Sequence, residues 1–177
     1  MGRGTRLGTS GMTEQQRLFL VQARSNYMVF DVLRKDDTLP RCHALYSLQI
    51  ATELLGKAYG WRNGPIEPTH RALVPFLRSL SANPKAQKQL GFSGQNANWR
   101  NLLRKSIPLA SVIERLAPAL AGDGPNSENP WPRFPNDPTE APVEFAFPLW
   151  AELTETAHGR QFLKLLADLF AVAEAYL

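Results

Sequence analysis

The stretch RCHALYSLQIATELLGKAYG, residues 41–60, decides the fold. Its apolar side chains recur every three or four positions, which is the spacing that aligns them on one face of an α-helix. Glycine is the preferred residue directly after a helix, so we expect Gly60 to cap the C-terminus. The segment therefore predicts one long, buried helix, and its apolar stripe consists of Ala44, Leu48, Ala51, Leu55 and Ala58.

The segment before it also predicts a helix. Thr13 and Gln16 form a capping box, in which the threonine hydroxyl accepts a hydrogen bond from the first turn and the glutamine side chain reaches back. Apolar residues continue at helical spacing to about Lys35, and residues 36–40 then break the pattern. This helix and the central one are therefore joined by a short turn.

Helical patterns also follow the central segment. We expect a helix over residues 69–80, with Thr69 as the N-cap and a kink or a short first turn at Pro75, and a second helix from Asn83-Pro84 to Gly91. A third helix is expected over residues 98–120 with a bend at Pro108, and the last over residues 149–177 with a break near Gly159. No alternating strand pattern and no internal repeat is present in the sequence.

Length and composition fit a single domain. The chain has 177 residues, of which 44% are hydrophobic, enough to bury a sizeable core. We predict an all-α fold, an antiparallel up-and-down bundle of four to five main helices over residues 13–177. Residues 1–12 are expected to form a disordered tail.

A proline-rich segment precedes the last helix. Residues 121–148 hold seven of the 14 prolines, together with the aromatic residues Trp131, Phe134, Phe145 and Phe147. A connection of this length is either functional or poorly ordered. The aromatic residues favour packing along the body of the bundle, and we refer to residues 121–148 as the Pro-rich arm.

The sequence predicts a cytoplasmic protein without a membrane segment. No run approaches the roughly 20 apolar residues that a spanning helix needs, and the N-terminus lacks the apolar stretch of a secretory signal. The single cysteine, Cys42, suits a reducing compartment.

Charge is distributed unevenly around a mild net charge of +4. Residues 84–115 carry six Lys or Arg against one Glu, and residues 121–156 are acidic. This pattern fits either a polyanion site beside a shielding arm or two solvated faces that attract each other. Within the basic segment, an aromatic ring adjoins cations, which is the chemistry that binds single-stranded nucleic acid. Trp99, Arg100 and Arg104 are therefore candidate phosphate-binding residues.

A second line of residues on the central helix carries its polar chemistry. Besides Ile50 it contains His43, Tyr46, Glu53 and Lys57, spaced three and four apart. Glu53 and Lys57 form an i,i+4 pair in the favourable order. With His70 from the next helix, these four polar residues are the candidate polar groove, placed at the seam of a dimer.

The runs CHALYSLQIATELLGKAYGW (42–61) and THRALVPFLRSL (69–80) resemble the core of HEPN domains. In that family, a helix with a Glu-x-x-x-Lys-Ala pattern is followed by a loop and a helix that begins with His. The matching residues here are Glu53, Lys57 and Ala58, then His70, Leu73 and Leu77. The later PRFP (132–135) is similar to an Arg-aromatic-Pro element found after the bundle in some members.

The resemblance implies a bundle that is often dimeric and acts on or near RNA. Many members are metal-independent RNases or toxin partners of nucleotidyltransferases, and others are non-catalytic accessory modules. The RNases use an Arg followed four to six residues later by a His. Here seven residues separate Arg62 from His70, eight separate Arg34 from His43, and no His follows Arg100 closely. We therefore expect a homodimeric, non-catalytic HEPN-like module in an RNA- or nucleotide-linked system, without metal or cofactor.

Two other functions remain open from the sequence. The chain can be a protein-interaction domain whose Pro-rich arm engages a partner, or a bundle with a small-ligand pocket beneath that arm. The sequence contains no phosphate-binding loop, dinucleotide fingerprint or nucleophile elbow. Its histidines are too scattered for the spacing that a helix uses to bind zinc.

Overall fold

The computed structural model describes residues 11–63, 69–117 and 148–177, and all regular elements in these ranges are helical. The elements are α1 (Glu14–Leu33), α2 (Arg41–Gly60), the 3₁₀ turn η1 (Trp61–Asn63), α3 (Leu73–Leu80), α4 (Pro84–Gln89), α5 (Asn96–Glu114), α6 (Pro148–Glu155), α7 (Ala157–Ala171) and α8 (Ala173–Tyr176). The predicted all-α fold is therefore confirmed.

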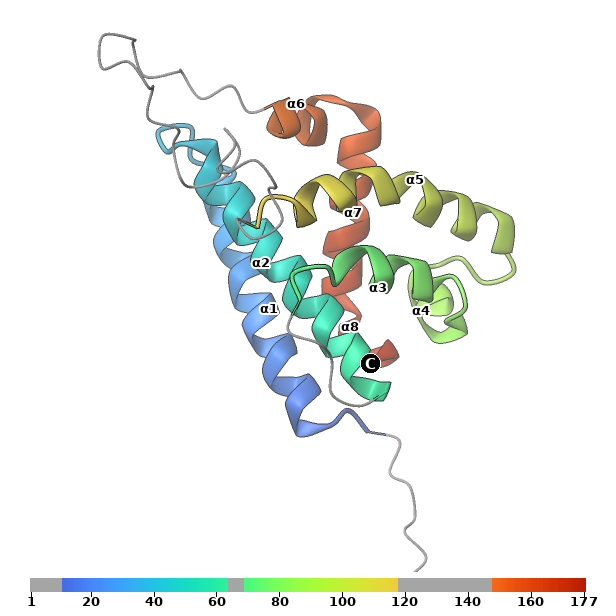
Figure 1. Ribbon diagram of the computed structural model, residues 1–177. Coiled ribbons are helices and arrows are strands. Elements are labelled where there is room, and N and C mark those ends of the chain that lie inside the picture. The colour runs from blue at the N-terminus through green and yellow to red at the C-terminus, as the bar shows by residue number, and fades with distance from the viewer. Residues whose placement is uncertain (1–10, 64–68, 118–147) are drawn as a thin grey trace, which may run out of the picture.

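Helices α1 and α2 form a long antiparallel pair along one edge of the molecule (Figure 1). The capping box at the start of α1 is present as predicted, since Thr13 Oγ1 accepts from the Gln16 backbone N–H at 3.2 Å and Gln16 Oε1 accepts from the Thr13 N–H at 3.0 Å. The Gln16 side chain is buried and also donates to the Ala58 carbonyl at 3.1 Å. One glutamine thus begins α1 and fixes it to the end of α2.

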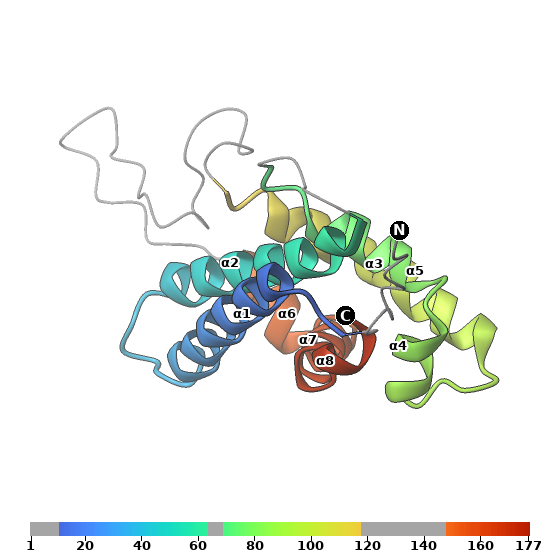
Figure 2. The same ribbon diagram turned by 90° about the horizontal axis from the view of Figure 1, so that it is seen from below.

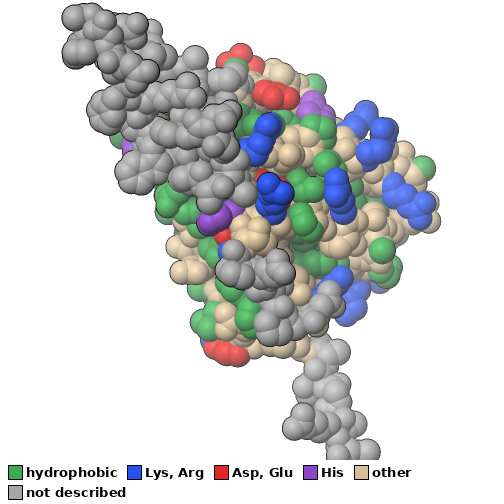
Figure 3. Space-filling view, in the orientation of Figure 1, with side chains coloured by type: hydrophobic (Ala, Val, Ile, Leu, Met, Phe, Trp, Pro, Cys, Tyr) green, Lys and Arg blue, Asp and Glu red, His purple; other side chains and the backbone are tan. Residues whose placement is uncertain are grey.

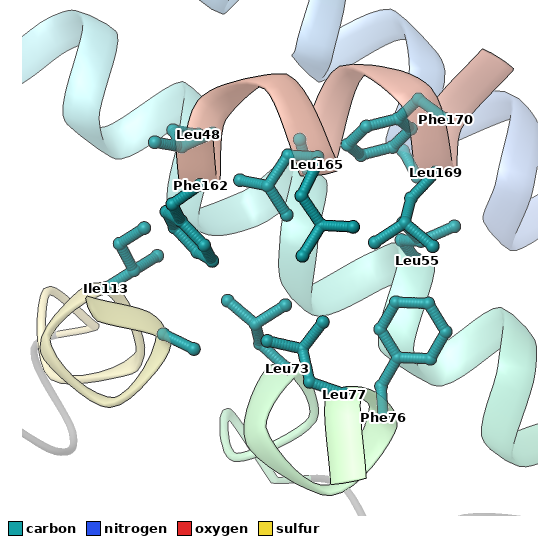
Figure 4. Packing of buried hydrophobic residues seen from close by; sticks show 14 of the residues in the cluster. Leu48, Leu55, Leu73, Phe76, Leu77, Ile113, Phe162, Leu165, Leu169 and Phe170 are labelled. Carbon is teal, nitrogen blue, oxygen red and sulfur yellow. The ribbon is translucent and has the colours of Figure 1, made fainter. Parts of the chain in front are cut away.

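The other helices cover the opposite side of α2. Figure 2 shows α7 and α8 beside α1 and α2, with α3, α4 and α5 further from α1. The hydrophobic core lies where four of these helices meet (Figure 4), and Leu55 of α2, Leu77 of α3, Ile113 of α5 and Phe162 of α7 are among its fully buried side chains. Every helix in this core therefore depends on α2, which is buried on nearly all sides.

Two predicted helix ends were wrong. Gly60 does not cap α2, because the chain continues through it into η1. The Trp61 ring packs against Phe19 at 5.7 Å between centroids, and the Arg62 guanidinium lies 3.8 Å from the centroid of Tyr59. These tertiary contacts stabilise an extra turn that the local signal does not predict.

Helix α3 begins later than expected. Its N-cap is Ala72 rather than Thr69, so that Pro75 falls within the first turn, where a missing N–H costs no helical hydrogen bond. The Val74 N–H is satisfied by the Glu114 carboxylate of α5, at 2.9 Å. By contrast, the Asn83-Pro84 start of α4 is confirmed, since the Asn83 side chain accepts from the Ala86 N–H at 3.0 Å.

The last helical segment is divided at Thr156, three residues before the predicted break. Thr156 caps α7, and Gly159 lies inside its first turn. A Cβ at Gly159 would collide with the backbone of Glu152 and Leu153 in α6. Glycine is therefore required here by the close approach of two helices, not by a break in one.

Parts of two predictions fall outside the described residues. Residues 1–10 of the predicted tail and residues 118–147, nearly all of the Pro-rich arm, are not among them. Met12, which we had assigned to the tail, packs against the core. In the described ranges, no helix combines the length and apolar character that a membrane crossing requires.

The α6–α7 contact gives a stability prediction. We expect Gly159→Ala to lower the free energy of unfolding by about 2 kcal/mol, because the added methyl group must push two backbones apart. Urea denaturation monitored by circular dichroism measures the change. Gly11→Ala is the control, since nothing lies within 4 Å of a Cβ at that position. Equal stability of both variants would contradict the packing constraint.

Candidate functional site

The Glu53 carboxylate is the centre of a polar network on α2. It accepts hydrogen bonds from Gln49 Nε2 at 2.7 Å and from Lys57 Nζ, both on the same face of the helix. Its Oε2 atom also lies 2.9 Å from His70 Nδ1, which comes from the segment before α3. The structure therefore joins Glu53, Lys57 and His70, three of the five residues of the predicted polar groove.

Burial and charge compensation act together at Glu53. Its side chain is 10% exposed, compared with 17% for Lys57 and 47% for His70. Burial by itself raises the pKa of the Glu53 carboxyl, but the hydrogen bonds from Lys57, His70 and Gln49 outweigh it and leave the pKa below its usual value. The carboxylate is consequently ionised at neutral pH and holds His70 with one ring nitrogen facing it.

Two contacts position the His70 segment. Gly56 of α2 allows the backbone to approach closely, because a Cβ there would collide with the Ala72 carbonyl. On the far side, the buried Glu114 carboxylate accepts from the Val74 N–H and so fixes the start of α3. The distance between His70 and Glu53 is thus determined by backbone packing as well as by their hydrogen bond.

A pocket of about 270 Å³ opens beside this network, between α2 and the start of α3. Three cationic side chains, Lys57, Arg62 and Arg71, line it together with Thr69 and Phe76. Cations and a hydroxyl around a small hollow suit an anionic group such as a phosphate. The pocket is small compared with most ligand sites.

The remaining two residues of the predicted groove lie elsewhere on α2. His43 and Tyr46 are exposed, and neither contacts Glu53. At 1.5 Å per residue, His43 is about 15 Å from Glu53 along the helix axis. Residues at intervals of three and four lie along one side of a helix, but His43 and Glu53 are too far apart along α2 to form a single site.

A second hollow, a groove of about 490 Å³, lies between α3 and α5. Its floor is apolar, and its rim carries the guanidinium groups of Arg78, Arg100 and Arg104. Figure 3 shows cationic side chains spread over this face of α3 and α5. We call Arg71, Arg78, Arg100 and Arg104 the arginine face. The floor of its groove is formed by Leu77, Leu103, Ile107 and Pro108.

Trp99 does not belong to this surface. Its side chain is 1% exposed, its ring packs against Phe92, and its indole N–H donates to the Leu80 carbonyl at 3.2 Å. The predicted stacking of Trp99 on a nucleobase therefore does not fit its position. The ring fills the core between the end of α3 and the start of α5, since its apolar area outweighs its single polar atom.

Several residues of the Glu53 network and of the surroundings of the two hollows were not predicted from the sequence. Gln49 precedes Glu53 by four residues, as Lys57 follows it by four, so the helical spacing contained the signal. Arg71 and Arg78 are seven residues apart, but Arg71 precedes α3, so helical spacing does not relate the two. Glu114 had no local signal, because its partner Val74 is 40 residues away.

Neither a metal site nor a known relative accounts for these residues. In the described part of the chain, no group of three or more His, Cys, Asp or Glu is arranged to hold a metal ion. Comparisons with protein-family models, curated proteins and solved structures find no match. The similarity to HEPN domains consequently remains a prediction from short motifs.

The Glu53 network predicts a pH-dependent stability. Because the pKa of Glu53 is lowered in the folded state, its ionised form stabilises the protein above the ordinary value of 4.5, and this contribution is lost as the pH falls through the folded-state pKa. We expect Glu53→Gln to cost about 2 kcal/mol at neutral pH and much less in acid. Urea denaturation at both pH values measures the difference.

The matched control is Asp168→Asn, which breaks the exposed i,i+4 pair with Lys164. Exposed pairs contribute little, so this variant should change stability by less than about 0.5 kcal/mol. A pH profile of Glu53→Gln parallel to that of the wild type would show that the network is not the source of the acid sensitivity.

Proposed function

We propose that this chain is a non-catalytic, HEPN-like module of the cytoplasm that binds RNA through its arginine face. The observation that carries the proposal is the contrast between two sets of arginines. Arg17, Arg24, Arg34 and Arg41 each form an ion pair with an Asp or Glu. By contrast, no residue of the arginine face lies within 4 Å of a carboxylate that the structure describes.

The unpaired arginines suit a phosphate backbone. A polyanion gains affinity when cations replace its condensed counterions, and guanidinium groups bind phosphate oxygens in pairs. The buried Glu114 attracts Arg71 and Arg78 from a distance but occupies neither guanidinium group. Arg71 precedes α3, Arg78 lies within it, and Arg100 and Arg104 lie in the neighbouring α5. This spread of charge favours an extended anion over a single small one.

The floor of the groove favours single-stranded RNA. Ile107 and Pro108 offer apolar surface between the cations, above the buried side chains of Leu77 and Leu103. Unpaired bases expose flat, apolar faces that pack on such surface, whereas the bases of a duplex are stacked on each other. We therefore place the phosphates of a single strand on the arginines and one or two bases over the groove.

The proposal includes the absence of cleavage. An RNase of the type that the resemblance suggests needs an imidazole and an Arg around one phosphate. His70 is turned toward Glu53 through Nδ1, and the Arg-to-His spacing of the family is absent from the sequence. We assign Glu53 and Lys57 a structural role, in which they hold the segment that leads into α3.

The nucleotide-linked alternative is favoured by one observation, the pocket with Lys57, Arg62 and Arg71. If this pocket takes a mononucleotide phosphate, ATP or GMP should raise the melting temperature of the wild type but not of Arg62→Ala/Arg71→Ala. An equal shift of the melting temperature in both proteins would exclude this pocket as the nucleotide site.

The RNA proposal is tested by binding of a fluorescent single-stranded RNA at several salt concentrations. We expect Arg100→Ala/Arg104→Ala to weaken binding and to reduce the slope of log affinity against log salt by about 1.4, the value for two lost phosphate contacts. The control Arg34→Ala/Lys35→Ala removes the same charge from residues that are already paired with Asp31.

Equal losses of RNA affinity in the two double variants would show that only the net charge of the protein matters. Absence of RNA binding by the wild type would contradict the proposal. Incubation of the same RNA with wild type, His43→Ala and His70→Ala tests for cleavage. Products that form with the wild type and disappear in either variant would contradict the non-catalytic role.

A further inference from the structure

An apolar stripe on the outer face of α1 has no counterpart within the described bundle. Met28 is 69% exposed and Val32 67%, and Leu18, Val21 and Val29 are also exposed. The core residues of α1, such as Leu20 and Phe30, lie on the opposite side of the helix. Figures 1 and 2 show α1 at the edge of the molecule, beside α2. This stripe is unusual because five large apolar side chains are exposed on one helix.

We propose that two copies of this chain associate through the outer face of α1, with the two helices antiparallel. The sequence led us to expect a dimer seam along the polar edge of α2. Glu53 on that edge is instead covered within the monomer by His70. The α1 stripe is a separate surface, and its use does not depend on RNA binding.

The spacing of the stripe suits helix pairing. Leu18, Val21, Ser25, Met28 and Val32 follow one another at intervals of three and four residues, the seam pattern of paired helices. Ser25, the smallest of them, stands at the midpoint and allows two helices to approach closely. A two-fold axis at Ser25 places Leu18 level with Val32 of the other copy and Val21 level with Val29, next to Met28, so that each apolar residue meets another.

The charges beside the stripe determine the orientation. Arg17, Arg24 and Asp31 follow one flank of α1 at intervals of seven, while Gln15, Gln22 and Val29 follow the other flank. In an antiparallel pair like flanks face each other, so Arg17 of one copy lies opposite Asp31 of its partner, twice per dimer. Within the monomer Arg17 pairs with Glu14, Arg24 with Glu174, and Asp31 with Arg34 and Lys35. The exposed Arg17 and Asp31 side chains would therefore share these partners with each other across the seam.

A parallel pair would place the charged flank against the uncharged one and would gain no ion pair. The antiparallel arrangement is therefore the one that the charge pattern favours. The stripe from Leu18 to Val32 spans about 21 Å of helix. We expect a dimer that dissociates in the micromolar range.

Sedimentation equilibrium of the full chain over a range of concentrations tests the interface. The wild type should reach twice the monomer mass, and Met28→Asp should remain monomeric at concentrations at which the wild type is dimeric. The control is Leu39→Asp, which alters an exposed leucine outside α1 and should leave the dimer unchanged. Circular dichroism verifies that both variants keep their helix content, and a variant that loses it is replaced by Val32→Asp.

A wild type that stays monomeric at every concentration overturns the proposal, and so does dissociation that is as strong in Leu39→Asp as in Met28→Asp. Charge reversal tests the orientation. Arg17→Glu and Asp31→Arg should each weaken the dimer by about tenfold, since each pair occurs twice, and the double variant should restore it. Failure of the double variant to recover the affinity excludes the antiparallel register.

Discussion

The arrangement of α2 and α3 depends on the hydrogen bonds of one ionised carboxylate. This carboxylate belongs to Glu53, which is buried in the middle of the chain's central helix. A charge removed from water is tolerated only when donors surround it, and here they come from Gln49, Lys57 and His70. Two of these donors belong to α2 itself, but the third must be brought from another segment. Residues 69–72 therefore have to lie against α2, and Gly56 leaves the space in which Ala72 does so.

This return of the chain sets the position of α3 and, through it, of the surface around it. Helix α3 has only eight residues, too few to be stable alone, and it is fixed by Glu114 at its start and by Leu73, Phe76 and Leu77 in the core. Arg78 consequently lines the same groove as Arg100 and Arg104 of α5, and Arg71 lies close enough to Glu114 of α5 to lower the pKa of its carboxyl. The polar network is structural in this account, and the proposed RNA surface is its neighbour.

How well the sequence predicted each feature depended on how local its cause was. Thr13 with Gln16 and Asn83 with Pro84 act within one turn, and both helix starts were found where the sequence placed them. Gly60 failed as a cap because Trp61 and Arg62 pack on aromatic rings of the bundle. Gly159 was identified as special, although the cause is the backbone of α6 and not a break in the helix.

The candidate site followed the same rule. Glu53 and Lys57 were identified from their spacing on one helix, and the short motifs added His70. Tertiary packing removed Trp99 from the surface, and ten residues of helix separate His43 from Glu53 on α2. Tertiary packing also brings Arg78 beside Arg100 and Arg104. The sequence did not predict this, because no pattern within a single helix indicates which side of α3 faces α5.

The pKa of Glu114 is coupled to the charge state of the proposed RNA surface. Burial raises the pKa of its carboxyl, and the nearby charges of Arg71 and Arg78 lower it in part. Phosphates that neutralise these two guanidinium groups would remove the lowering effect and add negative charge close by. Binding of the strand would then raise the pKa of Glu114 further, so that a carboxyl group out of reach of the ligand would make the affinity depend on pH.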